Sequence, residues 1–199
     1  MGLFDFFSRD RKVTPAQSAP TVETQQVDFA PLVPMAAIIS NNDAQVAADI
    51  ATLAQGYEAF RTAHPDWCAK MRFGDPEPEQ LHATIRDAFV YWLAGYDTPF
   101  VYGAYIDWKE ATDDIVGQLK RVADSLGLSL DLAEIPFPGD EHTEAALQQI
   151  AGYVRERGYA LTVIDTESDS YHLYLVPQAE YDRMVALGAS VGFRVYSPA

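Results

Sequence analysis

The stretch "YALTVIDTESDSYHLYLVP", residues 159–177, holds two apolar runs on either side of a short acidic segment. Both runs are rich in β-branched and aromatic residues, which favour strands, and the small polar residues between them suit a turn. We therefore expect a β-hairpin here. Residues 178–192 are expected to form a helix and residues 193–198 an edge strand, so the C-terminal third predicts a hairpin, helix and strand in succession.

Four segments before this hairpin repeat apolar residues every three or four positions, which is the spacing of amphipathic helices. They cover 40–64, 78–95, 107–127 and a stretch that ends at Gly158. Two other segments have the composition or the alternation of strands, "PFVYGAYI" at 99–106 and "LSLDLAEI" at 128–135. Together they predict an α+β fold, a single domain of four to five helices packed on a small mixed sheet.

The N-terminal part differs from the rest of the chain in composition. Residues 1–12, "MGLFDFFSRDRK", combine apolar and basic side chains, so we expect a short amphipathic arm, the only part suited to contact a membrane surface. Residues 13–34 are rich in proline and glutamine, which predicts a disordered linker. The globular α+β domain is therefore expected at 35–199.

The charge balance limits the class of partner. The chain has 14 lysines and arginines against 29 aspartates and glutamates, a formal net charge of −15. This charge repels the phosphates of nucleic acids, so no nucleic-acid partner is expected, whereas a basic protein is attracted.

Motifs for cofactors and common enzyme classes are missing from the sequence. It contains no P-loop, dinucleotide fingerprint or serine-hydrolase motif, so we predict no cofactor, no metal ligand and no catalytic residue. The single cysteine, Cys68, excludes an intrachain disulfide and fits a reducing compartment. Because the start also lacks the features of a secretory signal, the cytoplasm is the expected location.

Asp107 follows the strand predicted at 99–106, and Glu110 lies three residues further on. With aspartate in place of serine or threonine, this spacing matches a capping box, in which each side chain accepts a hydrogen bond from the other residue's backbone N–H. The alternative is a small-molecule enzyme that uses Asp107, Glu110 and Asp165, with or without a divalent cation.

A second group of carboxylates, Asp165, Glu167 and Asp169, occupies alternate positions between the two strands of the hairpin. This is the spacing of the first ligands of a calcium-binding EF-hand loop. However, Ser170 stands where that loop needs glycine and Val176 where it needs glutamate. A solvated acidic turn is therefore the better interpretation.

Aromatic residues are concentrated between residues 91 and 108, and Tyr102, Tyr105 and Trp108 fall on or next to the strand predicted at 99–106. Tyrosine and tryptophan supply much of the binding energy at protein interfaces. We therefore expect these three residues, together with the carboxylates named above, to form a contact surface.

The segments "WLAGYDTP", "YGAYIDWKE" and "LTVIDTESDSYHLYLVP" resemble an uncharacterised bacterial family, domain of unknown function 6630. The resemblance implies a bacterial cytosolic α/β domain with no assigned activity and no catalytic residue to transfer. Charge and missing motifs favour a non-catalytic, acidic binding or regulatory protein of the inhibitor or immunity kind that recognises a basic partner. The small-molecule enzyme stays open as the alternative.

Overall fold

Residues 27–139 and 142–198 are described by a computed structural model of the chain. Its helices and strands follow one another in this order: α1 Leu32–Ile39, α2 Ala44–Ala54, α3 Tyr57–Ala63, α4 Pro65–Lys70, α5 Leu81–Leu93, β1 Gly103–Asp107, α6 Thr112–Ser125, η1 Leu132–Glu134, α7 Thr143–Glu156, β2 Tyr159–Ile164, β3 Ser170–Pro177, η2 Gln178–Glu180, α8 Tyr181–Ser190 and β4 Val195–Tyr196. The predicted α+β fold is confirmed, and so are the hairpin and the helix and strand that follow it.

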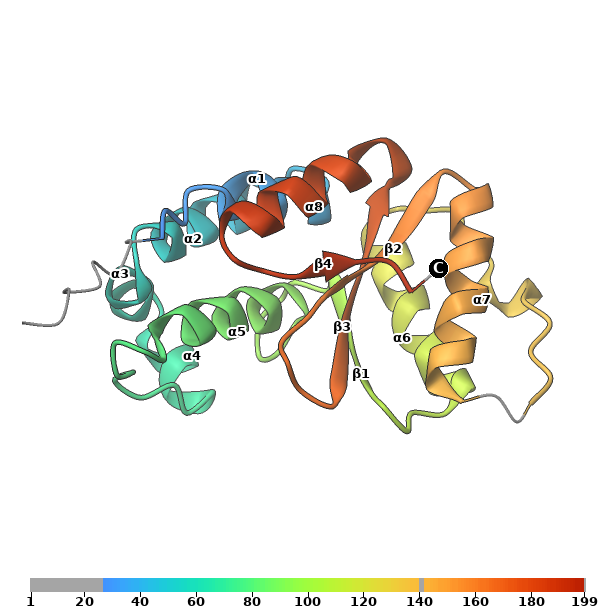
Figure 1. Cartoon of the computed structure of the whole chain (residues 1–199), viewed down its shortest axis with the longest axis horizontal. Helices are drawn as coiled ribbons and strands as arrows, with labels where there is room; N and C mark the ends of the chain where they lie inside the picture. Colours follow the sequence, from blue (N-terminus) through green and yellow to red (C-terminus); the bar gives the residue numbers. More distant parts are fainter. Residues whose placement is uncertain (1–26, 140–141, 199) are drawn as a thin grey trace, which may run out of the picture.

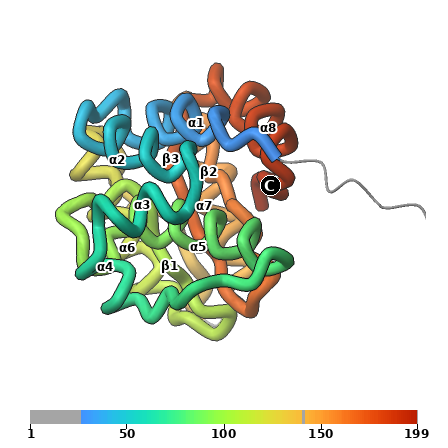
Figure 2. The backbone as a smooth tube through the Cα atoms, turned by 90° about the vertical axis from the view of Figure 1, so that its left-hand side faces the viewer, coloured from blue at the N-terminus to red at the C-terminus, as the bar shows by residue number. Residues whose placement is uncertain are grey.

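The four strands form one sheet in the order β1-β3-β2-β4, and every neighbouring pair is antiparallel. Helices α6 and α7 cover one face, and α1 to α5 with α8 cover the other (Figure 1). Figure 2, viewed from the left-hand side of Figure 1, shows α3 and α4 in front and α6 and α7 behind. The molecule is thus a three-layer arrangement with the sheet in the middle.

Strand alternation explains why two separate cores form. Leu161 and Leu173 point to the core shared with α6 and α7, whereas Ile164 and Tyr174 point to the larger core shared with the other helices. Successive side chains of a strand face opposite sides of a sheet. The central strands β2 and β3 are therefore apolar on both faces, which is why the hairpin is so clear in the sequence.

The sheet differs from the predicted one in two respects: it is antiparallel rather than mixed, and residues 128–135 contribute no strand to it. Leu130 and Leu132 of that segment are buried in the α6/α7 core, but its backbone forms local turns and the 3₁₀ helix η1. Asp131 accepts a hydrogen bond from the Ala133 N–H at 3.2 Å, which stabilises the turn. The alternation of the leucines indicates their burial correctly, but no strand in the described part of the chain pairs with this segment.

The described residues contain eight α-helices, more than predicted. The helix expected at 40–64 is divided into α2 and α3 at Gly56, whose φ of +125° does not fit a helix. Helix α4 starts at Pro65, because proline is tolerated in a first helical turn.

Helix α1 begins at Leu32, three residues before the expected start of the domain, and Leu32 is fully buried. The predicted arm at 1–12 and most of the predicted linker at 13–34 lie outside the described residues. Within the described ranges, no helix combines the length and the apolar character needed to cross a bilayer.

Candidate functional site at the acidic end of the sheet

Two loops that are far apart in the sequence meet at one end of the sheet. Strand β1 ends at Asp107, which lies opposite Ser170 at the start of β3, and the Trp108 N–H donates to the Asp169 carbonyl at 3.1 Å. The β1–α6 connection and the β2–β3 turn therefore lie together, at the bottom of Figure 1. We call this region the acidic end, defined by five carboxylate residues: Asp107, Glu110, Asp165, Glu167 and Asp169.

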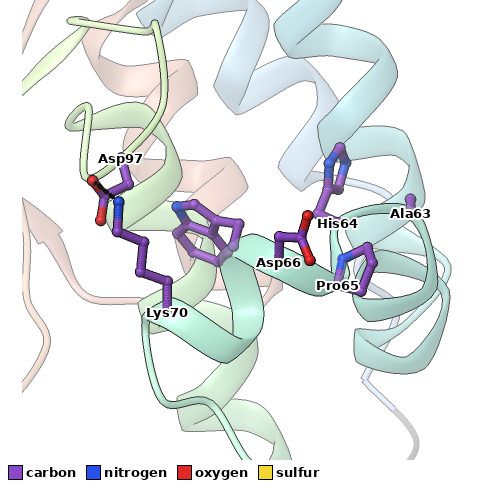
Figure 3. A pocket seen from close by; sticks show the side chains of 7 residues that line it. Ala63, His64, Pro65, Asp66, Lys70 and Asp97 are labelled. Atoms are coloured by element: carbon purple, nitrogen blue, oxygen red, sulfur yellow. Dashed lines mark ion pairs between the residues drawn. The ribbon is translucent and has the colours of Figure 1, made fainter.

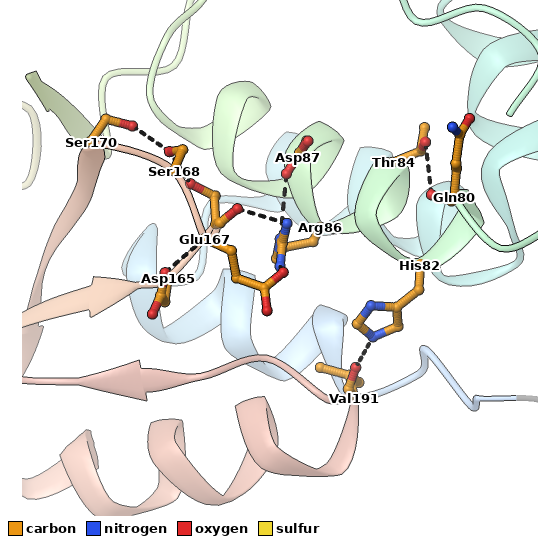
Figure 4. Close-up of polar contacts among 11 residues, drawn as sticks. Gln80, His82, Thr84, Arg86, Asp87, Asp165, Glu167, Ser168, Ser170 and Val191 are labelled. Atoms are coloured by element: carbon orange, nitrogen blue, oxygen red, sulfur yellow. Dashed lines mark hydrogen bonds and ion pairs between the residues drawn. The ribbon is translucent and has the colours of Figure 1, made fainter.

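The β2–β3 turn is organised by its own carboxylates and by Arg86 of α5 (Figure 4). Asp165 accepts from the Glu167 N–H at 2.7 Å and pairs with Arg194 at 3.2 Å. Arg86 pairs with Glu167 at 3.0 Å and donates to the Thr166 carbonyl at 2.8 Å. Two of the five carboxylates therefore have basic partners and a structural role.

Arg86 was not predicted as part of this site. Its guanidinium is largely buried and also lies 3.4 Å from the carboxylate of Asp87, whose pKa is raised by burial although Arg86 opposes the shift. Arg86 is separated from its turn contacts by 80 residues or more of sequence. An arginine within an amphipathic helix pattern carries no signal of such a distant partner.

The connection between β1 and α6 is a tight turn that precedes the helix. Asp107 accepts from the Lys109 N–H at 2.9 Å, and its carbonyl accepts from the Glu110 N–H at 3.0 Å. Helix α6 begins only at Thr112, and Ala111 is its N-cap. The predicted capping box is therefore wrong, because the side chain of Asp107 stabilises a turn that ends before the helix starts.

Trp108 is the most exposed large apolar side chain among the described residues, with 53% of its surface accessible. Lys109 places its ammonium group 4.2 Å from the centre of the indole ring. The Thr143 hydroxyl at the start of α7 donates to the Trp108 carbonyl at 2.8 Å, which fixes the backbone of this turn. The ring is therefore exposed while the backbone of Trp108 is held in place by this hydrogen bond.

Tyr102 and Tyr105, the other aromatic residues predicted to bind, do not lie beside Trp108 as exposed anchors. The Tyr102 hydroxyl donates to Asp43 at 2.8 Å, which links the segment before β1 to the start of α2. The Tyr105 ring is half-buried and lies against Tyr96 and His172, at centroid distances of 5.9 and 5.5 Å.

Asp43 is the N-cap of α2, where it accepts from the Gln45 and Val46 N–H groups at 2.8 and 2.9 Å. These bonds and the one from Tyr102 lower the pKa of Asp43. We expect Asp43→Ala to lower the free energy of unfolding by about 1–2 kcal/mol in urea titrations, and Asp43→Asn, which keeps an acceptor oxygen, by much less. Equal losses in the two variants would contradict the capping role.

A hollow of about 410 Å³ near α4 is lined by His64, Asp66, Lys70 and Asp97, among others (Figure 3). Lys70 and Asp97 form an ion pair at one side, whereas His64 lies at the other side. Nε2 of His64 is 3.6 Å from a carboxylate oxygen of Asp49, and burial lowers the pKa of His64. The polar groups of this hollow do not converge on a common point, so we assign it no chemistry.

A metal centre needs several ligating side chains that converge on one point. In residues 27–139 and 142–198, no three histidine, cysteine, aspartate or glutamate side chains are grouped so that they could hold a metal ion. Asp107, Glu110 and Asp165 therefore form no cation site, and the enzyme alternative gains no support from their arrangement.

The chain is an α+β domain with five carboxylate residues gathered at one end of an antiparallel sheet. The chain belongs to the family described as Domain of unknown function (DUF6630), whose model matches residues 32–199. Comparison with curated proteins and with solved structures gave no match.

Proposed function

We propose that this protein is a non-catalytic binding domain that recognises a basic protein partner through its acidic end. The main support for the proposal is the set of carboxylates in the loops around Trp108. Among the described residues, Asp107, Glu110 and Asp169 form no ion pair with a basic side chain, and all three belong to the two loops that meet at Trp108. Lys109 lies over the ring, but the three carboxylates outnumber its ammonium group, and the remaining negative charge suits lysine and arginine side chains.

The net charge of the whole domain supports the same class of partner. Residues 43–199 hold 11 basic and 25 acidic side chains, so they carry 11 − 25 = −14 of the total charge. Such a field accelerates association with a basic protein and is screened by salt. An inhibitor or immunity protein acting in the cytoplasm would use the field in this way.

Charge reversal at Asp169 provides the test, because its exposed carboxylate makes none of the turn contacts described above. Glu167 is less suitable, since its reversal would leave Arg86 beside a like charge. We expect Asp169→Lys to weaken binding of a lysine-rich peptide about tenfold at low salt, through slower association. Stopped-flow kinetics at about 0.05 and about 0.5 M salt measure the effect, which should disappear as the screening length falls from about 14 to about 4 Å.

The matched control is Glu156→Lys, which makes the same change in net charge on an exposed residue at the C-terminal end of α7. The acidic end lies by the opposite, N-terminal end of that helix, where Thr143 contacts Trp108. If Glu156→Lys slows association as much as Asp169→Lys does, the charge acts as a diffuse field and the acidic end is not a binding site. Binding that is independent of both substitutions would overturn the proposal.

A further inference from the structure

Strand β1 is an edge strand, since in residues 27–139 and 142–198 the sheet order β1-β3-β2-β4 gives it a partner on one side only. An edge strand presents backbone N–H and C=O groups that another chain can pair with. Whether β1 can accept such a partner depends on which of its residues direct these groups outward and on what lies beside them.

The register of β1 and β3 shows which residues face outward. In an antiparallel pair, directly opposite residues alternate between hydrogen-bonded and non-hydrogen-bonded pairs. The Trp108 N–H donates to the Asp169 carbonyl, so these two residues, which continue the register of Asp107 and Ser170, form a hydrogen-bonded pair. By alternation, Ile106 and Ala104 also bond to β3, and the backbone groups of Tyr105 point to the open edge.

A pocket of about 440 Å³ opens at this part of the edge. Tyr96 and Tyr105 line it from the side of α5, and Gln118 and Arg121 of α6 line it from the other side. Because α5 and α6 lie on opposite faces of the sheet (Figure 1), a pocket bounded by both sides must lie across the edge of β1. The pocket therefore adjoins the outward groups of Tyr105.

The remaining lining determines what kind of side chain the pocket suits. Glu110, which forms no ion pair among the described residues, lies in its wall, while Asp97 in the same wall is paired with Lys70. Arg121 adds a positive charge on the α6 side, so the pocket suits a lysine or arginine whose charged end lies at Glu110 and whose apolar stem lies against the tyrosine rings. Asp114, exposed in the first turn of α6, lies four residues before Gln118 and therefore on the same face of the helix.

We propose that β1 captures an extended segment of the partner as a fifth strand. The segment forms main-chain hydrogen bonds with Tyr105 and places a lysine or arginine side chain in the pocket, against Glu110. Strand addition derives affinity from main-chain bonds and specificity from pockets for alternate side chains. This inference rests on the proposed function, because it specifies how the basic partner is held.

Amide hydrogen exchange of the full chain tests the inference at single residues. The probe is an acetylated and amidated heptapeptide of alternating lysine and valine. We expect it to slow exchange of the Tyr105 amide about tenfold, the factor that corresponds to about 1.4 kcal/mol, while the amides of Ala104 and Ile106 serve as internal controls already bonded to β3. An analogue N-methylated at every backbone amide keeps the charges, but its methyl groups prevent its backbone from pairing with β1, and it should leave Tyr105 unprotected.

The outcomes separate strand addition from charge attraction. If both peptides bind equally and exchange at Tyr105 is unchanged, strand addition is wrong while the proposed function stands. If neither peptide binds at low salt, the proposed function fails and the inference fails with it. If the Tyr105 amide becomes protected with rising protein concentration and no peptide, the edge pairs with a second copy of this chain, which also overturns the inference.

Discussion

Replacing Tyr174 with alanine is expected to lower the free energy of unfolding by about 3–5 kcal/mol, the usual cost of removing a large buried aromatic side chain. Tyr174 of β3 is fully buried in the larger core. Its ring lies over Gly103 of β1, where an added Cβ would come within 2.6 Å of the ring. The side chain therefore fills space that its neighbour leaves open, and truncation would create a cavity between β1, β3 and α5.

The matched control for this substitution is Tyr174→Phe, which keeps the ring and removes the hydroxyl that donates to the Val90 carbonyl at 3.2 Å. That carbonyl still accepts from the Ala94 N–H at 3.0 Å, so it is not left without a partner. We expect a loss of about 1 kcal/mol for the phenylalanine variant. Urea unfolding measures both variants, and similar small losses would show that the ring does not hold β3 against α5.

The second large effect is a loss of stability in acid caused by His172. This residue of β3 is fully buried, and neither ring nitrogen has a hydrogen-bond partner among the described residues. Burial, reinforced by the positive charge of Arg86, lowers the pKa of His172 from 6.5 to about 4. The rings of Tyr91 and Tyr105 enclose it at centroid distances of 5.1 and 5.5 Å.

The direction of the effect follows from proton linkage. Because the folded-state pKa lies below the unfolded-state pKa, the unfolded chain binds the proton more readily, and stability is lost as pH falls from 6.5 towards 4. Each pH unit in this window costs about 1.4 kcal/mol. Between pH 7.5 and pH 5.0, His172 should therefore lower the free energy of unfolding by about 2 kcal/mol.

Comparison with His172→Phe isolates this contribution, since other titrating groups, including His64, remain in both proteins. The variant also removes two buried polar atoms without partners, so we expect no loss of stability at pH 7.5. Urea unfolding at the two pH values should show the variant to be less sensitive to acid by about 2 kcal/mol. Equal pH dependence of the two proteins would mean that His172 is protonated in the folded state as easily as in the unfolded chain.

The hairpin at 159–177 and the helix within 78–95 could be predicted from local pattern. Burial on both faces of a strand gives a continuous apolar run, whereas burial on one face of a helix gives apolar residues at every third or fourth position. The pattern at 128–135 failed for a related reason. Alternation indicates which side chains are buried, but a strand also needs a neighbouring strand to pair with, and within the described residues this segment forms only local backbone hydrogen bonds. The prediction of a capping box was wrong because α6 begins at Thr112, after both Asp107 and Glu110, although the spacing of these two residues matches the motif.

By itself, the sequence determined the α+β class, the negative charge of the domain and the acidic character of the two loops, since these depend on composition and local order. Only the tertiary structure decided that Asp107 lies opposite Ser170 and that Arg86 holds the turn at Thr166 and Glu167. It also decided that Tyr102 binds Asp43 while Trp108 remains exposed. Contacts across 59 to 81 residues of sequence arise from the packing of whole elements, and no local pattern of side chains encodes them.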